Sequence, residues 1–138
     1  MEIVIDEFII SDDKNKIQLD VVCKLLNATY WAKERPRNII EKSIANSLCF
    51  GIYLNENQIG FARCVTDFAT VYWLADVIID EDYRALGLGK SLIDAITKHE
   101  LLRDCFGILG TQHAHRLYEK YGFNLVTDRF MRKSAEAE

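Results

Sequence analysis

The sequence contains a single proline, three histidines and no C-x-x-C cysteine pair. The single proline and the lack of repeats or low-complexity tracts favour one domain, so we expect residues 1–138 to form a single domain. The histidines are scattered and the four cysteines stand apart among apolar neighbours. We therefore expect no metal site, and reduced cysteines that pack in the core.

Long apolar runs and an excess of positive charge are also missing. No segment is long and apolar enough to span a bilayer, and the first residues lack the basic and apolar regions of a signal peptide. The formal net charge is -4, which is not the basic footprint of a nucleic-acid-binding protein. We expect a cytoplasmic protein, a monomer or a homodimer, without membrane or nucleic-acid partners.

The composition is that of a globular domain, with 49% hydrophobic and 28% charged residues. Asn38 and Glu41 have the spacing of a capping pair in the second helix, and Gly122 is placed to stop the last one. Short connections predict an antiparallel meander, and a helical crossover predicts a parallel strand after it. The apolar pattern predicts strands over 3–10, 48–54, 59–66, 71–79, 106–109 and 123–126, and helices over 17–27, 36–46, 88–99 and 114–121.

Residues 77–92, VIIDEDYRALGLGKSL, carry the clearest chemical signal, since a strand runs into a glycine-bearing loop that opens a helix. The first N–H groups of a helix have no partner inside it and attract anions. Gly87 and Gly89 let a phosphate approach the main chain closely. We expect the amides of residues 86–91 to be unpaired and to hold a diphosphate.

Two other phosphate-binding motifs do not fit this segment. Gly89-Lys90-Ser91 is similar to the end of a P-loop, but Arg84 occupies the place of its first glycine. The dinucleotide-binding fingerprint requires a third glycine where Leu92 stands. The pattern that remains is Arg-x-x-Gly-x-Gly.

This pattern resembles the pyrophosphate loop of the GNAT N-acetyltransferase superfamily, and residues 74–84 are similar to the family's lead-in to that loop. Residues 114–123, AHRLYEKYGF, resemble its A-x-x-L-Y-x-x-x-G-F signature. Residues 30–33, 47–51 and 60–63 are similar to those of small bacterial members. Two positions depart from the family: Ala85 stands where glycine is usual, and Thr111 where asparagine is frequent.

The resemblance implies an α/β (α+β) fold, with a mixed, mostly antiparallel sheet of six or seven strands and about four helices in the order β-α-α-β-β-β-α-β-α-β. It implies transfer of an acetyl group from acetyl-CoA to the primary amine of a small molecule or peptide. A non-catalytic acetyl-CoA-binding sensor or interaction module is the alternative, and a nucleotide-binding protein is a third. The implied coenzyme-binding residues are Val77, Ile78, Ile79, Arg84, Ala85, Leu86, Gly87, Leu88, Gly89, Lys90, Ser91, Thr111 and Tyr118.

Acetyl transfer requires a neutral amine and a protonated leaving sulfur. Tyr118 keeps its proton at neutral pH and matches the family's general acid, although packing in its helix is an alternative role. Asp76 interrupts an apolar strand where the family often has a carboxylate near the acceptor. Burial would raise its pKa and make it a base. An exposed or ion-paired Asp76 is the other possibility, and many members of the family use an ordered water as the base.

The connection between the first two helices holds two aromatic and several charged residues. In this fold that connection borders the acceptor cleft. We expect Tyr30, Trp31 and Arg35 to bind the acceptor, with Asp67 as a further candidate. A surface loop anchored by Trp31 is the alternative.

Overall fold

The strands of this chain pair in sequence order, β1-β2-β3-β4-β5-β6, in one six-stranded sheet. The computed structural model describes residues 1–135. The strands are β1 (Glu2–Ile5), β2 (Phe8–Ser11), β3 (Leu48–Leu54), β4 (Asn57–Thr66), β5 (Val71–Ile79) and β6 (Phe106–Ile108). The helices are α1 (Leu19–Asn27), α2 (Arg37–Ala45), α3 (Leu88–Thr97) and α4 (His115–Glu119), with 3-10 turns η1 (Lys14–Lys16) and η2 (Glu81–Tyr83).

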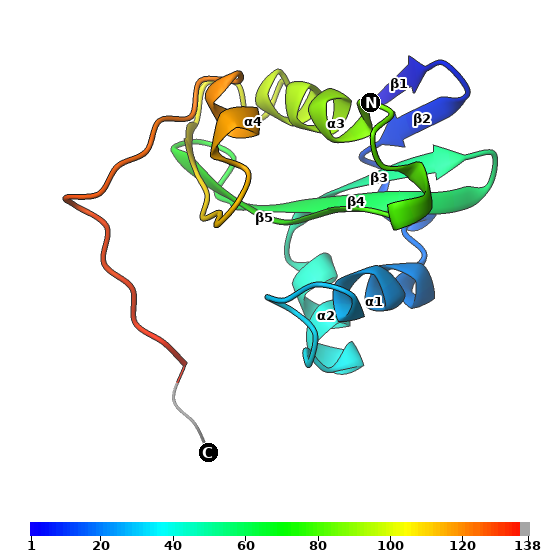
Figure 1. The fold of residues 1–138 in the computed structure, drawn as a ribbon, viewed down its shortest axis with the longest axis horizontal. Coiled ribbons are helices and arrows are strands. Elements are labelled where there is room, and N and C mark those ends of the chain that lie inside the picture. The colour runs from blue at the N-terminus through cyan, green and yellow to red at the C-terminus, as the bar shows by residue number, and fades with distance from the viewer. Residues whose placement is uncertain (136–138) are drawn as a thin grey trace.

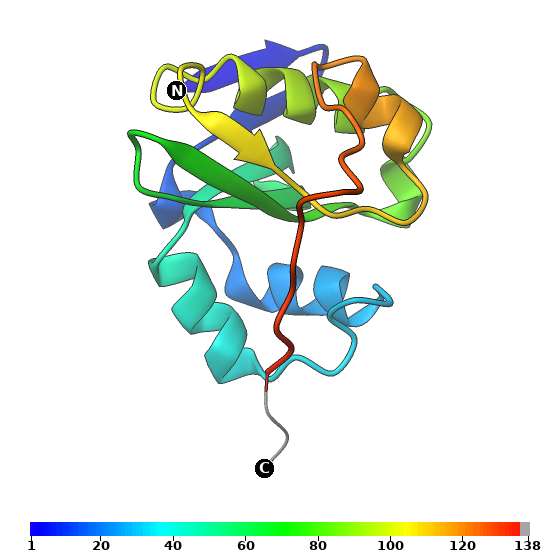
Figure 2. The ribbon, with the colours of Figure 1, turned by 90° about the vertical axis from the view of Figure 1, so that its left-hand side faces the viewer.

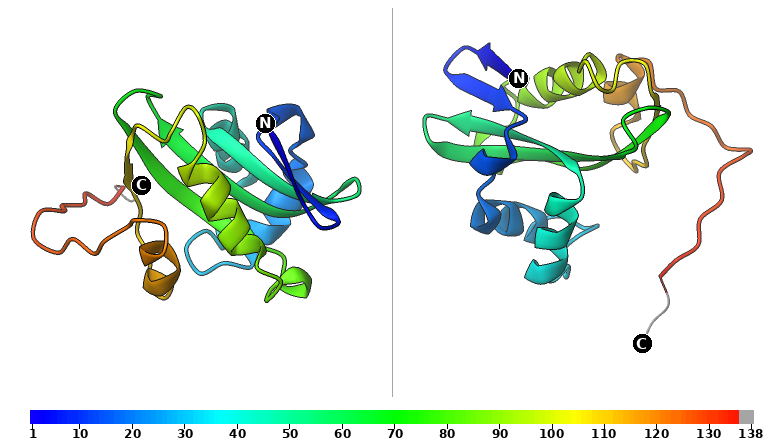
Figure 3. Two further views of the ribbon diagram at one scale, coloured as in Figure 1. Left: turned by 90° about the horizontal axis from the view of Figure 1, so that it is seen from above. Right: turned by 180° about the vertical axis from the view of Figure 1, so that it is seen from behind.

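Helices cover both faces of the sheet. The helices α1 and α2 lie on one face, and α3 and α4 lie on the other (Figure 1). The strands β1 to β5 are antiparallel to their neighbours, whereas β6 is parallel to β5 and is reached through α3. Figure 2 shows β6 beside β5, and Figure 3 shows α3 crossing the sheet. The expected fold class, the meander and the parallel strand are confirmed.

The first predicted strand is in fact a hairpin. Ile5 pairs with Phe8, so the two residues between them form a tight turn that separates β1 from β2. Asp6 has φ 52°, in the left-handed region that Asp tolerates better than most residues. A single strand over residues 3–10 was therefore wrong, because the polar pair in its middle reverses the chain.

The strand predicted over residues 123–126 is absent. A strand needs a ladder partner, and residues 123–135 pair with no strand in the described chain. Their apolar side chains make ring contacts instead: Phe123 meets Tyr118 edge-on at 5.9 Å between ring centroids, and Phe130 stacks on Trp73 at 6.2 Å. The predicted final strand was wrong, and no seventh strand forms among residues 1–135.

Two predicted helix ends had different outcomes. Pro36 is the N-cap of α2, which has no side-chain cap, so the capping pair of Asn38 and Glu41 was wrong. Proline starts the helix earlier because its φ is already near the helical value. Gly122 does stop the last helix: its φ is 92°, and the amides of Gly122 and Phe123 donate back to the carbonyls of Glu119 and Tyr118.

Each face of the sheet has its own core. The α3 face is packed by residues such as Phe50, Leu92 and Ile96, and the α1–α2 face by Val22, Ile40 and Phe61. Cover on both faces explains why β3 and β4 are almost continuously buried. All four cysteines are free; Cys49 and Cys64 are buried as expected of core residues, whereas Cys23 and Cys105 are half-buried. Within residues 1–135 there is no helix that could span a membrane and no His, Cys, Asp or Glu cluster suited to a metal.

Candidate active site

A β-bulge in β5 shapes the centre of the candidate site. Phe61 pairs with Ile78 and Arg63 with Ala75, so Asp76 and Val77 together oppose a single residue of β4. Asp76 takes φ 54°, a conformation that an L residue adopts at some cost. The bulge shifts the register of the β4–β5 pairing, which resumes at Ile78 and Ile79.

Beyond this point β5 has an open edge. The pairing of β5 with β6 ends at Trp73 and Ile108, so the edge facing β6 has no strand partner over residues 74–79 in the described structure. Val77, Ile78 and Ile79 are half-buried there. Main-chain groups along such an edge can bond to an extended ligand in the manner of an added strand.

The loop after β5 leads directly into the start of α3. The Asp80 carboxylate accepts a 2.9 Å hydrogen bond from the amide of Asp82, and Arg84 Nε donates to the Ile79 carbonyl at 3.1 Å. Gly87 is the N-cap of α3, with φ 77° and no side-chain cap. The loop is therefore held by its own contacts and leaves the helix start uncovered.

The amides at this helix start form a shorter row than expected. The Ser91 amide donates to the Gly87 carbonyl at 3.1 Å, so Ser91 was wrongly included among the unpaired amides. Among the described residues, the amides from Leu86 to Lys90 have no hydrogen-bond partner. No atom lies within 4 Å of where a Cβ would stand on Gly87 or Gly89, so a phosphate has room to reach them.

Ala85 occupies a second strained position in the loop. Its φ is 64°, in the left-handed region where glycine is favoured. This conformation explains why glycine is usual at this place in the loop that the sequence resembles. The alanine keeps the backbone path and its amide, at a cost in conformational energy.

Tyr118 and Thr111 line the same cavity. It has a volume of about 780 Å³ and lies between β6, α4 and residues 122–130. Burial raises the pKa of Tyr118, so its phenol stays protonated at neutral pH. The Thr111 hydroxyl accepts a 3.1 Å hydrogen bond from the Ala114 amide at the start of α4, and it keeps its own proton to donate.

This cavity and the amide row are separate features. None of residues 77–91 lines the cavity, whose walls come from α4, β6 and the C-terminal segment. We assign phosphate binding to the amide row, because unpaired N–H groups attract an anion and a cavity with largely apolar walls does not. The two features are connected through the core: Tyr118, which lines the cavity, belongs to the same hydrophobic cluster as Leu88, the first residue of α3.

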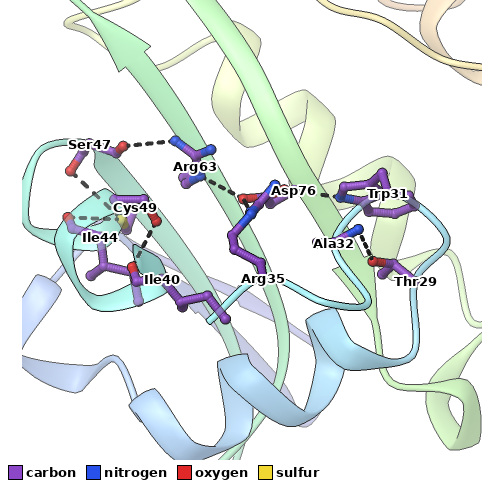
Figure 4. A network of polar contacts seen from close by, with 11 residues as sticks. Thr29, Trp31, Ala32, Arg35, Ile40, Ile44, Ser47, Cys49, Arg63 and Asp76 are labelled. Carbon is purple, nitrogen blue, oxygen red and sulfur yellow. Dashed lines mark hydrogen bonds and ion pairs between the residues drawn. The ribbon is translucent and has the colours of Figure 1, made fainter. Parts of the chain in front are cut away.

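On the opposite face, Asp76 joins the α1–α2 loop to the sheet. Its buried carboxylate accepts hydrogen bonds from Trp31 Nε1 at 3.0 Å, Arg35 at 2.7 Å and Arg63 Nε at 2.6 Å (Figure 4). The loop is also fixed by Thr29, whose hydroxyl accepts from the Ala32 amide at 3.1 Å. Trp31, Arg35 and Asp76, predicted separately, thus come together.

The expected rise in the pKa of Asp76 was wrong. Burial does favour the neutral acid, but the hydrogen bonds and charges of Arg63 and Arg35 outweigh it and lower the pKa below the usual value. A carboxylate with this pKa and three donors is a poor proton acceptor at neutral pH. The ion-paired alternative describes Asp76.

Neither Arg63 nor its hydrogen-bond partner Ser47 was identified from the sequence as a member of this network. Arg63 also donates to the Ser47 hydroxyl at 3.3 Å, so it links β4, β5 and the end of α2. An arginine within the apolar strand β4 was the available signal, since a buried guanidinium requires an acidic partner. Which partner it meets depends on the bulge, which the sequence does not reveal.

The other two predicted acceptor residues have different positions. The Tyr30 ring meets Trp31 edge-on at 5.1 Å and His113 at 6.2 Å, so Tyr30 borders the chain that enters α4. Asp67 instead caps the β4–β5 turn, and accepts from the Thr70 hydroxyl and from the amides of Thr70, Ala69 and Val71. These bonds lower the pKa of Asp67. It does not join the network around Asp76.

A family model described as an acetyltransferase (GNAT) domain matches residues 45–125, more than half of the chain. The chain belongs to the GNAT acetyltransferase family. The matched range runs from β3 to α4, and so contains the amide row and Tyr118. The α1–α2 loop lies outside it.

Solved and curated proteins agree with membership of the GNAT family. The structure of an acetyltransferase assigned to that family, from Xanthomonas campestris pv. campestris, is 31% identical with a TM-score of 0.84, covering 93% of this chain and 96% of that one. An acetyltransferase of Gibberella zeae is 22% identical over 67% of this chain, and a ycf52-like N-acetyltransferase of Prochlorococcus marinus is 32% identical over 54% of it. The chain spans 63% and 44% of the lengths of these two relatives.

Proposed function

We propose that this GNAT protein transfers the acetyl group of acetyl-CoA to the primary amine of a small molecule or peptide. The observation that carries the proposal is the row of unpaired amides from Leu86 to Lys90, which follows the open edge of β5 along the chain. Acetyl-CoA offers a diphosphate for the first feature and an extended amide-containing arm for the second.

The residues present fit this coenzyme. The open space at Gly87 and Gly89 admits a phosphate, and Arg84 and Lys90 add positive charge to the loop. Thr111 retains a hydroxyl proton for a further contact. When bound, acetyl-CoA supplies the activated acetyl group that the amine attacks directly.

Three groups of this chain would assist that attack. A main-chain N–H group of Val77 or Ile79 would donate to the acetyl oxygen, where negative charge develops. Tyr118 would act as the general acid and give its proton to the leaving sulfur. Asp76 would position Trp31 and Arg35, while solvent takes the proton from the amine.

The test is an acceptor screen that follows release of free thiol from acetyl-CoA, combined with thermal unfolding. Acetyl-CoA should raise the melting temperature because it binds the native state, and ATP should not. Thiol release that depends on an amine supports the enzyme. Coenzyme binding without transfer to any amine would favour a sensor or interaction module, and a larger shift with ATP would favour nucleotide binding.

A further inference from the structure

The charges around Asp76 do not balance. Its side chain is 2% exposed, and both Arg35 and Arg63 donate to the same oxygen, Oδ2. One carboxylate facing two guanidinium groups leaves a surplus of one positive charge. A surplus charge in a half-buried place is stabilised when an anion binds there.

Arg35 is the guanidinium that a ligand can reach. Its side chain is 23% exposed and lines a cleft of about 410 Å³ formed by residues 30–35. An arginine carries five N–H donors, and a single one of Arg35 has a partner in the described part of the chain. Arg63 bonds to both Asp76 and Ser47 and does not line the cleft.

The other groups of the cleft leave this surplus in place. Lys33 and Glu34 also line it, and their opposite charges offset one another. Tyr30 and Trp31 are 60% and 42% exposed, large apolar surfaces for a loop that the sheet anchors. The cleft therefore combines two aromatic walls with one available guanidinium, at a volume that suits a small molecule.

We infer that this cleft binds an acceptor that carries a carboxylate as well as its amine, such as a free amino acid or the end of a short peptide, with Arg35 holding the carboxylate. The inference rests on the proposed function. The fork of a guanidinium matches a carboxylate with two parallel hydrogen bonds. A carboxylate carries the single negative charge that balances the surplus, whereas a phosphate monoester carries nearly two.

The first experiment compares phenylalanine with phenylalaninamide as acceptors, in the wild type and in Arg35→Gln. For each protein, the ratio of kcat/KM for phenylalanine to kcat/KM for phenylalaninamide is measured. Dividing the wild-type ratio by the Arg35→Gln ratio cancels the different basicity of the two amines. We expect Arg35→Gln to lower kcat/KM for phenylalanine by roughly 10- to 100-fold, and for the amide by less than about threefold. Arg37→Gln, an exposed arginine paired with Asp20, is the matched control and should change neither.

The second experiment measures binding without turnover. It therefore tests whether Arg35 binds a carboxylate even if neither amine is acetylated. Trp31 and Trp73 are the two tryptophans, and Trp73→Phe leaves Trp31 as the fluorescent probe. N-acetylphenylalanine should quench Trp31 fluorescence saturably, its amide should not, and Arg35→Gln should abolish the effect. Melting temperatures show whether each variant is folded.

The outcomes separate this inference from the function on which it rests. Equal use of both amines with no binding of N-acetylphenylalanine would overturn the inference, while acetyl-CoA binding and transfer would keep the enzyme. A preference for phosphoethanolamine over both amines would overturn it in favour of a phosphate. Absence of any coenzyme binding would overturn the proposed function, and the fluorescence titration would still decide whether Arg35 binds a carboxylate.

Discussion

Arg63 of β4 and Asp76 of β5 are joined by a hydrogen bond of 2.6 Å, although Arg63 pairs in register with Ala75. In a regular strand, successive side chains point to opposite faces of the sheet. The bulge and the left-handed φ of Asp76 bring its carboxylate to the face that Arg63 occupies. Backbone strain at one residue thus builds the connection between the sheet and the α1–α2 loop.

Replacing Asp76 should therefore destabilise the protein. Asp76→Asn removes the buried anion and leaves two guanidinium groups facing each other, a change that typically costs about 3 kcal/mol. Urea unfolding would measure it. Asp128→Asn is the control, because its pair with Arg129 is exposed and worth at most about 1 kcal/mol. Equal effects of the two changes would show that the Asp76 network adds little stability.

The same carboxylate should make the free energy of unfolding depend on pH. Its pKa in the folded protein lies below the usual 3.8 despite burial, because of Arg63 and Arg35. The resulting stabilisation is complete above the unfolded pKa and is lost as the pH falls through the folded pKa. Unfolding free energies of the wild type and of Asp76→Asn should converge below about pH 4. A constant difference between pH 7 and pH 3 would contradict the lowered pKa.

Ala85→Gly should stabilise the protein. Ala85 has φ 64°, where a Cβ costs about 1 kcal/mol and glycine has no such cost, although glycine gains freedom when unfolded. We expect a net gain of about 0.5 kcal/mol in thermal or urea unfolding. Ala28→Gly is the control: its φ of -87° is ordinary, so the same change there should destabilise. Destabilisation at both positions would mean that Ala85 is unstrained.

Local patterns predicted most of the fold. The bounds of β3 and β5 agree with the prediction, because each is an apolar run between polar turns. The α3 stripe and the stop at Gly122 follow from spacing alone. The hairpin turn at Asp6 was missed because a non-glycine residue adopts a left-handed φ there. The amino-acid sequence alone does not distinguish such a turn from a short polar interruption within one strand.

The candidate site was predicted unevenly for a related reason. The amide row depends on a loop contiguous with its helix, so the sequence places it, apart from Ser91, whose amide closes the first helical bond. The Asp76 network joins residues 41 and 45 positions away in sequence and depends on a bulge. Asp76, Trp31 and Arg35 were recognised one by one and Arg63 was missed. Their ion pairing, and hence the sign of the pKa shift, required tertiary structure.

Gly89→Glu should abolish the rise in melting temperature that acetyl-CoA causes, because a bulky anion would stand where the diphosphate binds. Gly89→Ala is the matched control. It separates the effect of an added Cβ from that of the anion. A Cβ at this position meets no protein atom within 4 Å outside its own helix and chain neighbours, and alanine favours a helix, so this variant should fold and lose less of the shift than Gly89→Glu. A shift of normal size in Gly89→Glu would show that the start of α3 does not hold the coenzyme.

Tyr118→Phe should lower kcat by about 100-fold and change the Kd for acetyl-CoA by less than about threefold, because it removes a proton donor but no packing surface. Burial is the one cause that shifts the Tyr118 pKa, and its hydroxyl makes no hydrogen bond among residues 1–135, so phenylalanine should cost little stability. Tyr121→Phe, which lines the same cavity, should leave kcat unchanged. Steady-state thiol release and coenzyme titration separate the two constants. If both variants lost activity equally, or neither did, Tyr118 would be a packing residue, and the leaving sulfur would take its proton from elsewhere.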